Sequence, residues 1–201
     1  MNSSLFLELE AAINAVEPRV LEGYNPGLTD TEIDAIMAQV SFDLPDDLRA
    51  LYRWRDGDNN QWIGILGSFQ WMIPFSVGHS SSFVRGDIEA FHESVSDAPL
   101  PFDLNAKEVV PVFDDGGDGT YIIAVWSQQE KETCEIWTYI PSDFPFLRLT
   151  YRGVEPMIQT ALEWWRNGVF SPVEHERDWR LETDWDKYGA IGQHLNPDCP
   201  D

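Results

Sequence analysis

The sequence predicts one α+β domain in which helices at both ends of the chain enclose a run of short strands. Three observations lead to this prediction. Apolar residues recur at helical spacing up to about residue 56, the period changes to two between residues 61 and 151, and helical spacing returns over 154–168. A chain of 201 residues is long enough for one domain with a sizeable core. The aromatic share of 13%, with nine Trp, argues against disorder and predicts heavy aromatic packing.

Three helices are expected before the change of period. Ser3 or Ser4 can cap the first, and Pro18 ends it. The stretch Thr29–Glu32 matches a capping box, so a second helix begins there. In the stretch "LPDDLRALYRWRDG", Pro45 suits the first turn of a third helix, and Gly57 suits the left-handed position that stops it.

Six strands are expected after these helices, because β-branched and aromatic residues alternate there with polar ones. They lie near 61–66, 69–74, 109–113, 119–126, 134–140 and 146–151. A short helix over 87–95 interrupts them, and a last helix runs from Val154 to Gly168. Residues 171–201 are expected to be an acidic C-terminal extension of a domain that spans 1–170. The aromatic residues of this extension predict that it packs back on the domain.

The net charge of −22 comes from 35 acidic and 13 basic residues. A field of this sign repels phosphates, so nucleic acids and anionic membranes are excluded as partners and a basic protein is favoured. The charge is uneven: residues 61–85 contain no acid, whereas residues 86–118 contain nine acids and Lys107 as their one basic residue. The two cysteines form no CxxC pair, which indicates reduced thiols and a cytoplasmic setting.

Signatures of catalysis and of metal or cofactor binding are incomplete. The stretch His175–Trp179 begins like the HExxH zinc motif but lacks the second histidine. Two acidic stretches fail as calcium loops: Asp56–Gly67 lacks the Gly at position 6 and the Glu at position 12, and Asp114–Val125 lacks the acid at position 3 and the Glu at position 12. The run Gly78–Ser82 lacks the final Gly of GxSxG. The sequence therefore predicts no enzyme, no metal and no cofactor, although carboxylate pairs of the glycosidase kind stay open as an alternative.

The strand near 134–140 has two faces with different chemistry. Cys134, Ile136, Thr138 and Ile140 share one face, and Glu135, Trp137 and Tyr139 share the other. If the first face is core, the second is an aromatic patch with an acid beside it. Such a patch either binds a protein or a sugar, or is covered by a helix or by the C-terminal extension.

The order of these pieces resembles the SUKH superfamily, which holds bacterial toxin-immunity proteins and the fungal Smi/Knr cell-wall regulators. The resemblance rests on Thr29–Glu32, "LPDDLRALYRWRDG", Trp62 in an uncharged strand, "VVPVFDDGGDGTYIIAVW" at 109–126, "EIWTYI" at 135–140 and the closing helix. It covers about residues 20–170. The segment 75–108 is longer than the usual connection in that family, and the chain after 170 is an addition.

The resemblance implies helices packed on a curved, mostly antiparallel sheet and a non-catalytic, protein-binding role. It implies an immunity protein that neutralises a cognate toxin, with a regulator of cell-wall synthesis as the alternative. A carbohydrate-binding module that uses Trp137 and Tyr139 is a further alternative, which rests on those aromatic residues and not on the resemblance. Many such toxins are basic nucleases, onto which an acidic inhibitor would be steered. The acidic segment 86–118 is therefore the first interface expected, with Asp114, Asp115 and Asp118 at its turn, and Glu135, Trp137 and Tyr139 are the other partner-binding candidates.

Overall fold

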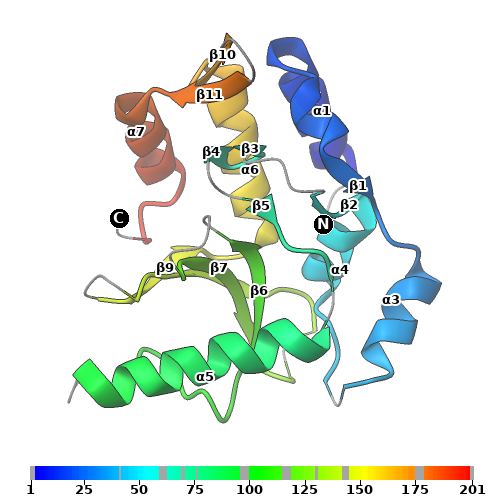
Figure 1. The fold of residues 1–201 in the computed structure, drawn as a ribbon, viewed down its shortest axis with the longest axis vertical. Coiled ribbons are helices and arrows are strands. Elements are labelled where there is room, and N and C mark those ends of the chain that lie inside the picture. Colours follow the sequence, from blue (N-terminus) through cyan, green and yellow to red (C-terminus); the bar gives the residue numbers. More distant parts are fainter. Residues whose placement is uncertain are drawn as a thin grey trace.

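The centre of the molecule is a five-stranded antiparallel sheet, which appears in a computed structural model of the chain (Figure 1). The structure describes residues 3–40, 42–58, 63–68, 71–75, 77–95, 100–114, 119–129, 131–141, 145–174 and 179–199. The strands follow one another in chain order: β5 (Trp71–Met72), β6 (Glu108–Asp114), β7 (Tyr121–Trp126), β8 (Glu135–Tyr139) and β9 (Leu147–Tyr151). Together with the helices around it, this sheet confirms the α+β class.

Both faces of the sheet are covered by helices. Figure 1 shows α5 (Val77–Val95) along one side, with α1 (Ser3–Val16), α4 (Asp46–Trp54) and α6 (Val154–Arg166) on the other. Alternate residues of each central strand point to opposite faces, so the apolar core has two layers. On β7, Ala124 and Trp126 join the large layer beneath α1, α4 and α6, whereas Ile123 and Val125 join the layer beneath α5.

The amino-terminal elements follow the expected order with one shifted boundary. After α1 come α2 (Arg19–Glu22), β1 (Tyr24–Pro26) and α3 (Asp30–Met37), which begins with the expected capping box between Thr29 and Glu32. Helix α4 ends at Trp54, before the expected Gly57. The chain turns directly into β2 (Arg55–Asp58), which pairs with β1. Gly57 does have a positive φ of 72°, but inside this strand, where a β-carbon would lie 2.5 Å from the nitrogen of Pro74.

Two of the expected elements differ in length from their prediction. Where strands were expected at 61–66 and 69–74, the described residues contain the short ribbon of β3 (Ile63–Gly64) and β4 (Gly67–Ser68) and the two-residue edge strand β5. Residues 61, 62, 69 and 70 of these predictions lie outside the described residues. The helix expected at 87–95 begins ten residues earlier, at Val77. Its first turns contain His79 and three serines without apolar spacing, so periodicity could not indicate them, and the absence of proline allows the helix to form.

The chain after α6 forms a hairpin and a helix that returns to the domain. Strands β10 (Phe170–Glu174) and β11 (Trp179–Thr183) pair with each other, and α7 (Trp185–Leu195) follows. The ring of Tyr188 on α7 stacks on that of Trp164 on α6, with centroids 3.9 Å apart. The indole N–H of Trp164 also donates to the carbonyl oxygen of Tyr188 at 3.0 Å.

A buried carboxylate joins three elements beneath the sheet. Asp47, in the first turn of α4, is 5% exposed. Its Oδ2 accepts hydrogen bonds from the Thr133 hydroxyl at 2.9 Å and from the backbone N–H groups of Cys134 and Val154 at 3.3 Å each. Asp47 therefore ties the start of β8 and the start of α6 to α4.

Candidate functional site

The aromatic face of β8 is covered. Trp137 is 9% exposed and Tyr139 is 2% exposed, and both belong to the core layer beneath α5. The ring of Phe102, from the segment that follows α5, meets Trp137 edge to face at 5.1 Å. Glu135 stays half-buried at the start of the strand, where it accepts from the Trp137 indole N–H at 3.2 Å and pairs with Arg152 at 3.2 Å. These rings are therefore not open to a sugar or a protein in this conformation.

The opposite face of β8 belongs to the core at the start of the strand, as expected if the aromatic face is the second one. Cys134 and Ile136 belong to the larger apolar layer. The two alternatives for Trp137 and Tyr139 were a binding surface and a surface covered by other parts of the chain. The structure shows the second, with α5 and residues 100–104 as the cover.

One of the three acids expected at the turn after β6 lies in the described part of the chain. Asp114 is half-buried at the end of β6, opposite Trp71 on β5 and Tyr121 on β7. Asp115 and Asp118 lie outside the described residues. Burial, with the carboxylates of Asp114 and Asp87 nearby, raises the pKa of Tyr121. The acid from the helix and the acid from the strand therefore converge on this end of the sheet.

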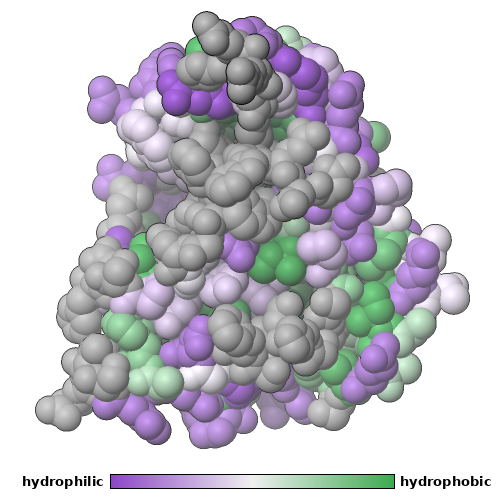
Figure 2. All heavy atoms as spheres, in the orientation of Figure 1, coloured by the Kyte–Doolittle hydropathy of each residue, from purple (hydrophilic) through white to green (hydrophobic). Residues whose placement is uncertain are grey.

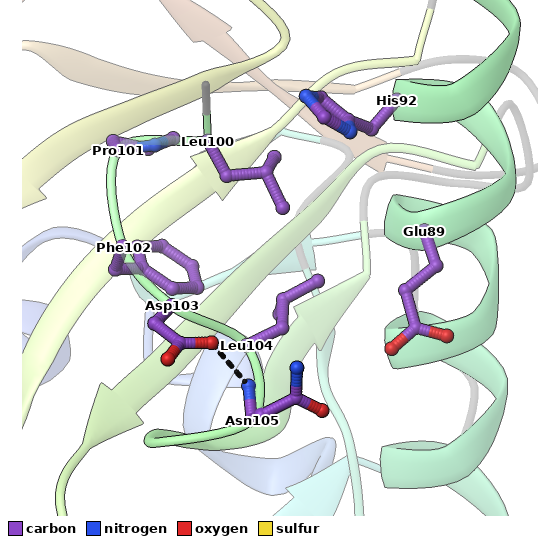
Figure 3. Close-up of a pocket in the computed structure, with 8 residues that line it drawn as sticks. All are labelled: Glu89, His92, Leu100, Pro101, Phe102, Asp103, Leu104 and Asn105. Atoms are coloured by element: carbon purple, nitrogen blue, oxygen red, sulfur yellow. Dashed lines mark hydrogen bonds between the residues drawn. The ribbon is translucent and has the colours of Figure 1, made fainter.

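A groove of about 660 Å³ opens between α5 and the segment 100–105 (Figure 3). Glu89 and His92 come from neighbouring turns of α5, and Leu100 to Asn105 form the facing wall. Leu104 is buried, which gives the groove an apolar floor, whereas the carboxylates of Glu89 and Asp103 belong to its opposite walls. The backbone N–H of Asn105 donates to Asp103 Oδ1 at 2.9 Å, which holds the loop in its turn.

Arg85 fastens this loop to the helix. Its guanidinium donates to the carbonyl oxygen of Leu104 and, at 2.6 Å, to that of Lys107, and it lies 3.8 Å from Glu108. This cation is therefore used inside the loop anchor. Because the anchor spans the same segment that forms the groove, the groove has a fixed outer wall.

Three acids at the groove or one helical turn from it have no basic partner in the described part of the chain: Glu89 and Asp103 line the groove, and Glu93 follows Glu89 on α5. Glu89 and Glu93 are exposed on α5, one helical turn apart, and Asp103 is exposed on the loop; none of them takes part in an ion pair. We call these three residues the groove acids. Exposed acids on other faces are often paired, as Asp34 is with Arg49 at 2.8 Å and Glu8 with Arg166 at 2.6 Å.

Hydrophilic and apolar residues both appear near the level of α5. In Figure 2 hydrophilic residues lie along the lower edge of the molecule, where Figure 1 places α5, and apolar residues lie beside them in separate patches. Carboxylates without an ion pair can accept hydrogen bonds from the charged ends of Lys or Arg side chains. The apolar floor can cover the methylene groups of the same side chains. The arrangement therefore suits the docking of a basic protein segment.

The described residues contain no group of three His, Cys, Asp or Glu side chains that could hold a metal ion. The acids with displaced pKa values have structural surroundings. Burial raises the pKa of Asp56, which accepts from the Phe75 N–H, and a hydrogen bond from Arg19 lowers that of Glu17. No helix in the described part is both long enough and apolar enough to cross a bilayer.

Sequence reasoning found the acidic segment but not the groove within it. The count of nine acids over 86–118 indicated the stretch in which the groove lies, and the spacing of Glu89 and Glu93 by four residues places both on one helical face. The position of Asp103 beside them depends on the Arg85 anchor. No local pattern predicts that a guanidinium will bind carbonyl groups about 20 residues away.

Comparison of the sequence with known proteins finds one family match. The sequence model of the SMI1 / KNR4 family (SUKH-1) matches residues 27–160, about two thirds of the chain. No curated protein matches the chain. The matched range includes the whole central sheet, α5 and the groove, and it ends before the hairpin and α7.

Proposed function

The chain belongs to the SMI1/KNR4 family (SUKH-1), and we propose that it binds a basic protein through the groove acids. The family is generally non-catalytic, which supports a binding role. The observation that carries the proposal is that Glu89 and Asp103, which line one fixed groove, and Glu93, one turn further along α5, are exposed and have no ion pair among the described residues, in a chain of net charge −22. Unpaired carboxylates keep their full attraction for a partner's cations, whereas an ion-paired carboxylate must first exchange its partner.

The finer role we propose is that of a cytoplasmic immunity protein that neutralises a cognate toxin by direct binding. A basic nuclease is the toxin class that suits the charge, since its nucleic-acid surface is positive and the field of this chain would steer it onto the groove. Regulation of the host's own envelope synthesis is the second candidate. It differs in the identity of the partner and not in the chemistry of the surface.

Affinity capture from the native host's lysate tests the proposal, at low salt and again at about 0.3 M, where exposed charges are strongly screened. We expect a basic protein to be retained at low salt and weakened at high salt. If that protein stops growth when expressed alone and not when expressed with this chain, the immunity role holds. If the captured protein belongs to envelope synthesis, the regulatory role replaces the immunity role. Failure to retain any basic protein at either salt concentration would refute the proposal.

The acids at the turn after β6 form a second part of the proposed interface. Asp114 lies at the end of the sheet toward which Asp87 of α5 also converges. Reversal of the charge at Asp114, Asp115 and Asp118 together should slow association and weaken affinity for the captured partner. Unchanged affinity and association rate would remove this turn from the interface and leave the groove acids as the remaining candidates.

A further inference from the structure

A second groove, of about 380 Å³, lies between α7 and the outer part of strands β8 and β9. Unlike the groove between α5 and residues 100–105, which we now call the acidic groove, it has no carboxylate among its lining side chains. Arg148 is the one lysine or arginine among them. In a chain with 35 acids this is an unusual lining, and it does not suit a basic peptide. The volume falls in the range of small-ligand sites, which are mostly apolar with a few well-placed polar groups.

One wall of this groove, which we call the α7 groove, is aromatic and rigid. Trp185 is 67% exposed, at the start of α7, and its ring meets that of Tyr188 edge to face at 5.4 Å. Tyr188 is held in turn by its stacking on Trp164 and by the indole hydrogen bond described above. Trp185 is one of two large apolar side chains exposed in the described part of the chain. Its open ring is a surface that a flat apolar ligand face would cover.

The sheet side of the α7 groove presents hydrogen-bond acceptors. The Thr138 and Thr150 hydroxyl oxygens are 2.6 Å apart, and the Thr150 hydroxyl donates to the Arg148 carbonyl oxygen at 3.3 Å. A hydroxyl has one hydrogen, so Thr138 is then the donor to Thr150, and the Thr138 oxygen keeps lone pairs for a further donor.

The helix side of the groove adds another acceptor. The amide nitrogen of Asn196 donates to Thr160 Oγ1 at 3.0 Å and to the Gly192 carbonyl at 3.1 Å. Both amide hydrogens are therefore used within the protein, which fixes the orientation of the side chain. The amide oxygen is left as the group that can accept from a ligand.

Two glycines on α7 keep the groove open. Gly189 and Gly192 both line it, in the interior of an eleven-residue helix where glycine is destabilising relative to alanine. A β-carbon at Gly189 would meet no atom within 4 Å, so no close approach of the backbone requires glycine there. The space beside this residue is part of the groove.

From this lining we propose that the α7 groove binds an uncharged ligand with an apolar ring face and several hydroxyl donors, which is the chemistry of a neutral saccharide. The ring face covers Trp185, and ligand hydroxyls donate to the oxygens of Thr138 and Asn196. The site is independent of the acidic groove. It also lies partly outside the range that the family model matches, because α7 supplies its aromatic wall.

Isothermal titration of the full chain with maltose, cellobiose and N,N′-diacetylchitobiose tests this inference. We expect at least one of these disaccharides to bind with a millimolar or tighter dissociation constant. Trp185→Ala should weaken that binding by about fivefold or more. Leu7→Ala is the matched control, because Leu7 is 66% exposed on α1, and it should leave binding unchanged. Gly189→Leu should abolish binding by filling the groove while the thermal unfolding of the protein stays cooperative.

Two results would overturn the inference. One is the absence of heat with all three disaccharides, and the other is binding that persists in both Trp185→Ala and Gly189→Leu. Sedimentation velocity over a range of protein concentrations adds a third test. A dimer that forms with rising concentration and is abolished by Trp185→Ala would show that a second copy of the chain, and not a saccharide, covers this ring.

Discussion

Replacement of Asp47 by alanine is the sharpest test of how the fold is held together. The change removes the acceptor of three hydrogen bonds from N–H and O–H groups in other parts of the chain, and of a longer one from the Cys134 thiol at 3.9 Å. The Cys134 and Val154 N–H groups are at buried residues, and each stranded donor of this kind costs about 1–3 kcal/mol. The Thr133 hydroxyl is on an exposed residue and can turn to water. The expected loss of unfolding free energy is therefore about 2–6 kcal/mol.

The assay is urea denaturation followed by tryptophan fluorescence, with differential scanning calorimetry beside it. At roughly 2–4 °C per kcal/mol for a chain of this size, Tm should fall by at least about 4 °C. The dependence of the unfolding free energy on urea should keep its slope, because the buried area hardly changes. Asp46→Ala is the control, since Asp46 is exposed in the same helical turn, and it should cost less than about 1 kcal/mol. A loss below about 0.5 kcal/mol in Asp47→Ala would refute the reasoning.

Three further predictions concern single residues. The hydrogen bond from Arg19 lowers the pKa of Glu17 from its ordinary 4.5, so this carboxylate stabilises the fold above that pH and the contribution is lost as the pH falls through the lowered value. Glu17→Gln should accordingly be less stable than the unchanged chain at pH 7, and the difference in urea midpoint should shrink as the pH is lowered below 4.5. Gly57→Ala should cost about 1–3 kcal/mol in the same assay, because φ is positive and the new carbon would clash with Pro74. Burial raises the pKa of the Cys134 thiol well above its ordinary value, so its alkylation by iodoacetamide at pH 8 should be no faster than unfolding; rapid labelling of the folded chain would show that the site is open.

The sequence indicated the elements that repeat a strong local pattern. The capping box at Thr29, the central strands and α6 follow from spacing and from side-chain type, and the structure contains them. The first half of α5 and the two-residue strands near Gly64 carry no such pattern. Their form depends on contacts with distant parts of the chain, as β5 shows by pairing with β6.

The candidate site shows the same division. The acidic composition of 86–118 was visible in the sequence, but the groove depends on the Arg85 anchor and on the burial of Leu104. Alternation of apolar and polar residues alone could not decide whether the side chain of Trp137 is buried or exposed. A strand with two covered faces and a strand with one open face can both place an aromatic residue at that position.

The central claim is that the groove acids bind a basic partner, and the rate of association with the captured protein tests it most directly. Reversal of Glu89, Glu93 and Asp103 to lysine should be compared with reversal of Glu22, Glu132 and Glu155. These control acids are also exposed and without an ion pair in the described chain, but they lie on other elements. Both triple variants change the net charge equally.

Stopped-flow measurement at low salt should show association slowed by roughly tenfold or more in the groove variant and by much less in the control. Both differences should shrink at about 0.3 M salt. Equal slowing in the two variants would mean that net charge alone steers the partner. An unchanged rate and affinity in the groove variant would contradict the claim that this groove is the binding surface.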